Sequence, residues 1–114
     1  MKVEKFEDIL AWQKARKLAL NIYKAFRVVK DFSFKEQIQR ASVSIMNNIA
    51  EGFERQTNKE FKNFLFIAKG SCAEVRSMLN LAFDLKYISK EEYFDLSNGS
   101  VEISRIISGF IKTL

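Results

Sequence analysis

The chain has 114 residues, of which 47% are hydrophobic and 29% are charged, and its formal net charge is +5. This length accommodates one domain with a single hydrophobic core. Histidine is absent and Cys72 is the only cysteine, which excludes Ser-His and Cys-His catalytic arrangements, an intramolecular disulfide and a thiolate zinc cluster.

The absence of proline and the presence of only four glycines favour helices over a β-rich fold with many tight turns. The first residues lack the apolar segment of a signal peptide, and no run of about 18 apolar residues could span a membrane. We therefore expect a cytoplasmic all-α protein that needs no cofactor and no membrane.

The positive charge is concentrated at the beginning of the chain. Residues 1–30 contain eight basic and three acidic side chains, which accounts for the whole net charge. The remaining residues contain eleven side chains of each sign, so their charges cancel.

The first predicted helix covers residues 8–29, and its apolar residues recur at steps of three and four. The opposite side of this helix carries a group of basic residues: Lys14, Arg16, Lys17, Lys24, Arg27 and Lys30. Such a stripe can follow the phosphates of a nucleic acid. It is also typical of any solvent-exposed helix face, so the pattern alone leaves both interpretations open.

The second predicted helix covers residues 34–55 and begins with a capping box, Ser33–Glu36. Its polar stripe contains Arg40, Asn47, Asn48 and Glu51. The neighbouring Glu51 and Glu54 could form an acid–base or metal pair. Carboxylate metal sites in helical bundles usually combine Glu with a Glu-x-x-His motif, which this chain lacks. We therefore predict surface carboxylates, no metal and no catalytic residue.

The third predicted helix covers residues 58–86, begins with the capping box Thr57–Glu60, and has Cys72 as a small buried hydrophobe in its core stripe. A second seam lies around its other side: Ile67, Gly70, Ser71, Met78, Leu81 and Leu85. This seam predicts a subunit interface, and the alternative is a wide core face. Glu74 lies within the seam and would need a partner such as Arg40 if it were buried.

The fourth predicted helix covers residues 90–112 and begins with the capping box Ser89–Glu92. The connections between all four helices are short, which places consecutive helices antiparallel. The sequence therefore predicts one domain that forms an up-down-up-down four-helix bundle.

One segment of the second helix resembles a known family signature. Residues 39–52 read QRASVSIMNNIAEG, and this segment is similar to the signature of the 23S rRNA intervening-sequence protein family, also called the four-helix bundle protein family. Further pieces agree in the same order, among them Trp12–Ala15, Ala68–Ser71 and Tyr87-Ile88. The resemblance extends from about Phe6 onward. Residues 30–33 depart from it, because family members often have proline in this connection.

The resemblance implies a four-helix bundle that assembles into a closed ring, with a pentamer as the expected size. Within the signature, Arg40, Asn48 and Glu51 match family positions, and we interpret them with Glu74 as structural or interface residues. The family is also similar to the accessory protein of diversity-generating retroelements, a basic pentamer that works with reverse transcriptase and RNA.

These observations predict a non-enzymatic homo-oligomer that binds RNA or DNA through the basic face of its first helix. The alternative is a protein-interaction scaffold that docks another protein and has no nucleic-acid binding of its own. A nuclease that uses Glu51 or Glu54 is the third hypothesis. The absence of histidine, a common general base and metal ligand, argues against this hypothesis.

Overall fold

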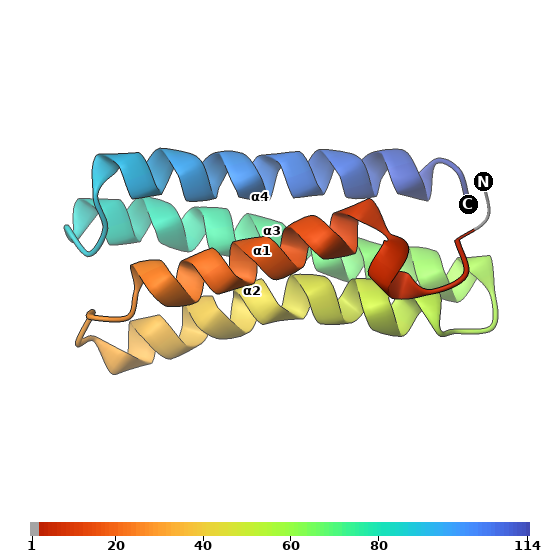
Figure 1. Ribbon diagram of the computed structural model, residues 1–114, viewed down its shortest axis with the longest axis horizontal. Helices are drawn as coiled ribbons and strands as arrows, with labels where there is room; N and C mark the ends of the chain where they lie inside the picture. The colour runs from red at the N-terminus through yellow and green to blue at the C-terminus, as the bar shows by residue number, and fades with distance from the viewer. Residues whose placement is uncertain (1–2) are drawn as a thin grey trace.

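The computed structural model describes residues 3–114 and has no β-strand within that range (Figure 1). A short 3-10 helix, η1, spans Phe6–Asp8. Four α-helices follow it: α1 (Leu10–Ala25), α2 (Phe32–Phe53), α3 (Asn58–Asp84) and α4 (Lys90–Ile111). The predicted all-α fold with four helices is therefore confirmed.

The four helices lie side by side along the long axis of a molecule that measures 43 × 22 × 19 Å (Figure 1). α1 begins and α4 ends at one end of the molecule, and the α1–α2 and α3–α4 turns lie at the other. Contacts between α2 and α3 run in opposite order along the two helices. Ser44 lies beside Ser71, whereas Gly52, further along α2, lies against the earlier residue Phe64 of α3.

Each helix buries one apolar side in a common core. The fully buried side chains include Ile22, Ile38, Ile45, Ile49, Leu65, Val75, Leu79, Ile103 and Ile107. Each side chain of this kind stabilises the fold by about 1.5–3 kcal/mol through burial. Cys72 is 2% exposed and belongs to this core, as predicted. Tyr23 and Phe83 also fall on the three- and four-residue spacing of apolar residues in their helices, yet they are 46% and 38% exposed.

The helix starts show which predicted caps form. Ser89 makes the complete capping box with Glu92, and the Thr57 hydroxyl accepts a hydrogen bond from the backbone N–H of Glu60. The predicted box at Ser33 is wrong, because Asp31 caps α2 by accepting from the N–H of Phe34 at 3.2 Å. Aspartate is an equally good N-cap, and α2 therefore begins two residues earlier than expected.

The predicted end of the first helix at residue 29 is also wrong, because α1 ends at Ala25. Beyond it, the N–H of Val29 donates to the carbonyl of Phe26 in a tight turn. This turn directs Phe26 and Val29 into the core, where both side chains are buried. The burial of these two large apolar residues makes the turn more stable than a helix that continues to residue 29.

Candidate nucleic-acid interface

α1 carries its positive charge on the sides that the core leaves free. Its buried residues are Ala11, Ala15, Leu18, Ala19 and Ile22. No acidic residue occurs between Ile9 and Lys30. Lys14 is half-buried, whereas the other basic residues predicted to bind nucleic acid are exposed: Arg16, Lys17, Lys24, Arg27 and Lys30.

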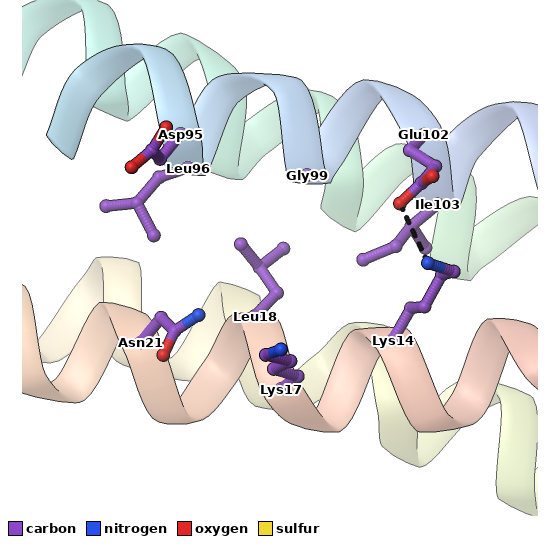
Figure 2. Close-up of a pocket in the computed structure, with 9 residues that line it drawn as sticks. All are labelled: Lys14, Lys17, Leu18, Asn21, Asp95, Leu96, Gly99, Glu102 and Ile103. Carbon is purple, nitrogen blue, oxygen red and sulfur yellow. Dashed lines mark ion pairs between the residues drawn. The ribbon is translucent and has the colours of Figure 1, made fainter. Parts of the chain in front are cut away.

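Two of these lysines face a groove between α1 and α4 (Figure 2). Lys14 Nζ lies 3.2 Å from Glu102 Oε1, and Lys17 lines the same groove, which Asp95 flanks on the α4 side. Leu18 and other apolar residues form its floor. Because two carboxylates offset the two lysines, this groove attracts phosphate less than the sequence pattern predicts.

The remaining cations lie away from this groove. A helix turns by about 100° per residue, which places Arg16 and Lys24 on either side of the exposed Leu20 of α1, and Arg27 follows in the turn beyond Ala25. The Arg16 guanidinium lies 5.9 Å from the centre of the Trp12 ring. Lys17 and Lys24, seven residues apart, lie on nearly the same side of α1. Lys14 is turned toward Glu102 of α4, and Arg27 and Lys30 follow in the α1–α2 turn, so the six predicted residues do not all form one helix face.

The α1–α2 turn continues the basic surface. Arg27 and Lys30 are joined there by Lys35, whose Nζ donates to the carbonyl of Arg27 at 2.9 Å. The sequence did not reveal the role of Lys35, because this residue belongs to α2 and joins the turn only through its contact with Arg27. The turn also exposes Val28 and Phe32, which are 77% and 72% exposed.

The predicted polar stripe of α2, which consists of Arg40, Asn47, Asn48 and Glu51, lines a groove. Val43 and Ser44 of α2 and Tyr23 of α1 complete the lining. Asn48 Nδ2 donates to the carbonyl of Ser44 at 2.8 Å, and Glu51 forms an ion pair with Arg55 at 3.1 Å. The structure thus brings Arg40, Asn48 and Glu51 to one surface of α2.

The pairing of Arg40 with Glu74 that the sequence suggested does not occur within residues 3–114 of the chain. Arg40 pairs instead with Glu36, one turn earlier on α2, at 3.1 Å. Within residues 3–114, the exposed Glu74 makes no ion pair and no side-chain hydrogen bond.

The predicted second seam of α3 divides into an outer face and a part that belongs to the bundle. Ile67, Leu81 and Leu85 are 47–52% exposed, and a Cβ on Gly70 would meet no atom within 4 Å. Ser71 is buried, with its Oγ 3.0 Å from that of Ser44, and Met78 packs against the core. We call the exposed residues Phe66, Ile67, Gly70, Leu81 and Leu85 the α3 outer face.

The thiol of Cys72 is not an activated nucleophile. Burial is the largest influence on this thiol and raises its pKa to about 11, which keeps it protonated near neutral pH. Glu54 is exposed, and the carboxylate of Glu51 is engaged by Arg55. Across residues 3–114, no group of three or more metal-ligating side chains comes together. No helix in that range is long and apolar enough to cross a membrane.

Comparisons with known proteins agree with this architecture. A similar solved structure is a protein of unknown function from the S23 ribosomal protein family of Bacteroides thetaiotaomicron, with 32% sequence identity and a TM-score of 0.85. The similarity covers 90% of this chain and 99% of that chain. No curated protein matches. Residues 7–109 match the sequence profile of the 23S rRNA-intervening sequence proteins, and the chain belongs to that family.

Proposed function

We propose that this protein is a non-enzymatic homo-oligomer that binds RNA or DNA through the basic residues of α1 and the α1–α2 turn. The observation that carries the proposal is the segregation of charge. The chain from Ile9 to Lys30 contains no carboxylate, and the bundle turns most of its cations to solvent. An extended group of exposed cations attracts a polyanion over the whole of its length.

The ion pairs of the bundle support a main role for some of the basic residues over others in this proposal. Arg16, Lys24 and Arg27 have no acidic partner in the bundle, whereas Lys14 is paired with Glu102. A phosphate that approaches Lys14 must compete with this carboxylate. We therefore assign the main role to Arg16, Lys24, Arg27 and Lys30. A smaller role goes to Lys14, which is paired with Glu102, and to Lys17, which shares a groove with Asp95.

Assembly is the second part of the proposal. The bundle is an antiparallel up-down-up-down subunit of a ring, with a pentamer as the expected size, and the opposite order of the α2–α3 contacts supports this topology. The α3 outer face supports assembly because it exposes large apolar residues around a glycine with open space beside it. A second copy that covers this face would bury Ile67 and Leu81, and a ring would bring several basic α1 surfaces together.

Binding of fluorescently labelled RNA and duplex DNA at low salt tests the nucleic-acid proposal. We expect the Arg16/Lys24/Arg27→Ala variant to lose affinity by at least about tenfold, because three phosphate contacts disappear. Lys59/Lys62/Lys69→Ala is the matched control, since it removes the same charge from α3. Equal losses in both variants would show that only net charge matters.

The oligomeric mass of every variant is measured in parallel by native mass spectrometry. If the wild type binds neither RNA nor DNA at low salt, the nucleic-acid proposal fails. The alternative is then a scaffold for another protein, and capture experiments with the assembled oligomer would search for that partner.

A further inference from the structure

The α1–α2 turn combines the two most exposed large apolar residues of the described chain with several cations. Val28 and Phe32 are 77% and 72% exposed. Arg27, Lys30 and Lys35 surround them in the sequence, and the Lys35 ammonium lies 5.7 Å from the centre of the Phe32 ring. We call Arg27, Val28, Lys30, Phe32 and Lys35 the turn patch.

The turn patch has a fixed shape, because contacts beneath it hold both ends of the turn. Lys35 donates to the carbonyl of Arg27, and Asp31 caps α2. Below the turn, the Phe34 ring lies 6.0 Å from that of Phe26 and 5.4 Å from that of Tyr87. The Phe32 ring is therefore presented to solvent by a packed turn, so a ligand would not have to order it first.

We infer that the turn patch binds an unpaired nucleotide, with a base stacked on the Phe32 ring and neighbouring phosphates held by Arg27, Lys30 and Lys35. This inference rests on the proposed nucleic-acid function and adds the structural class of the ligand. A base inside a duplex is covered by its neighbours on both sides, so away from duplex ends an exposed phenylalanine ring stacks only on an unpaired base. The cations next to the ring match the phosphates on either side of that base.

The carboxylate nearest to the turn patch in the sequence, Asp31, keeps its negative charge, and the cations Arg27, Lys30 and Lys35 outnumber it. Asp31 accepts hydrogen bonds from the Tyr87 hydroxyl at 2.7 Å and from the Phe34 N–H at 3.2 Å. Both bonds hold the Asp31 carboxylate where the α1–α2 turn meets the α3–α4 turn. Glu36 is likewise engaged, by Arg40.

A lipid surface is the other partner that a basic and apolar turn could meet. Two apolar side chains form a small anchor for a membrane, whereas one aromatic ring is sufficient to stack on a base. The geometry therefore favours the nucleotide, and a vesicle experiment makes the lipid an outcome of the test.

The test measures the affinity of the full-length protein for a short RNA strand without self-complementarity and for a long RNA duplex, in which few base pairs lie at an end. We expect Phe32→Ala to weaken binding of the single strand by about five- to hundredfold, the range for loss of one stacked base. Affinity for the duplex stays unchanged. Phe32→Trp retains single-strand binding, and Phe32→Leu loses it, because leucine is apolar but has no π face.

Phe94→Ala is the matched control. The Phe94 ring is also exposed and has a lysine ammonium, that of Lys90, at 5.9 Å, but its sequence neighbours include Glu91 and Asp95. These carboxylates repel phosphate, so removal of Phe94 leaves both affinities unchanged. Because both phenylalanines are exposed, neither substitution removes core packing, and circular dichroism confirms that each variant is folded.

Three results would overturn the inference. The first is unchanged single-strand affinity in Phe32→Ala, and the second is an equal loss for strand and duplex. The third is Phe32-dependent binding to vesicles of phosphatidylglycerol and phosphatidylcholine that Phe32→Leu preserves, which would assign the turn patch to lipid. If the α1 variant still weakens RNA binding while Phe32→Ala has no effect, the proposed function stands and only this inference fails.

Discussion

Asp31 links the two turns at one end of the bundle. The hydrogen bond from the Tyr87 hydroxyl is the largest influence that lowers the pKa of the Asp31 carboxyl, and the hydrogen bond from the Phe34 N–H lowers it further. The bond between Tyr87 and Asp31 also raises the pKa of Tyr87. A carboxyl whose pKa is lowered by folding stabilises the protein at pH values above its ordinary pKa of 3.8. This contribution is lost as the pH falls through the lowered pKa.

We therefore expect Tyr87→Phe to lower the melting temperature at neutral pH, and the deficit relative to the wild type to shrink below pH 3.8. Thermal unfolding followed by circular dichroism between pH 2 and 7 measures this difference. A deficit of constant size across the range would show that the charge of Asp31 is not responsible.

Cys72 provides a second prediction for a single residue. Its raised pKa of about 11 and its burial make the thiol slow to react in the folded protein. A disulfide reagent at pH 8 should label the native protein only slowly and the urea-unfolded protein at once. Cys72→Ala is the control for labelling elsewhere. Rapid labelling of the native protein would contradict the buried position of this side chain.

At the scale of the helix, Gly52 sets the distance between α2 and α3. A Cβ at this position would lie 2.6 Å from Phe64 Cβ and 2.9 Å from Phe61 Cδ1, so the helices would have to separate. We expect Gly52→Ala to destabilise the protein by about 1–3 kcal/mol in urea denaturation. Gly99→Ala is the control, because its Cβ would make an ordinary contact of 3.6 Å with Leu18. A Gly52 variant as stable as the wild type would contradict this packing.

Gly70 on the α3 outer face should behave in the opposite way. A Cβ there meets nothing within 4 Å in the subunit, so Gly70→Ala stabilises the helix by about 0.5–1 kcal/mol. The same methyl group would obstruct a second copy that packs closely against α3. We therefore expect a more stable subunit and a weaker oligomer, measured by denaturation and by native mass spectrometry at decreasing concentration. An oligomer of undiminished stability would remove Gly70 from the interface.

The existence and order of the four helices could be predicted from the sequence, because apolar periodicity and the caps at Thr57 and Ser89 depend on nearby residues. The beginning of α2 could not. Asp31 and Ser33 are both good caps, and the Tyr87 hydroxyl, 56 residues away, bonds to Asp31. The end of α1 could not be predicted either, because the burial of Val29 in the core depends on tertiary packing.

At the scale of the whole molecule, the positive charge of the candidate nucleic-acid interface could be predicted from the sequence, but the arrangement of its side chains could not. The excess of cations in the first thirty residues is visible in the sequence. The pairing of Lys14 with Glu102 joins the first and last helices, so only the packed bundle reveals that this lysine is partly neutralised. The exposure of Phe32 beside Lys35 also depends on where α2 begins.

The dependence of RNA affinity on salt tests the central claim most directly, because it counts the phosphates that the protein neutralises. For single-stranded RNA we predict a linear fall of the logarithm of the association constant with the logarithm of salt concentration. The slope should be shallower by about 2 in the Arg16/Lys24/Arg27→Ala variant, since each lost phosphate contact removes about 0.7. An affinity that does not vary with salt, or the same slope in both proteins, would contradict a nucleic-acid site on α1.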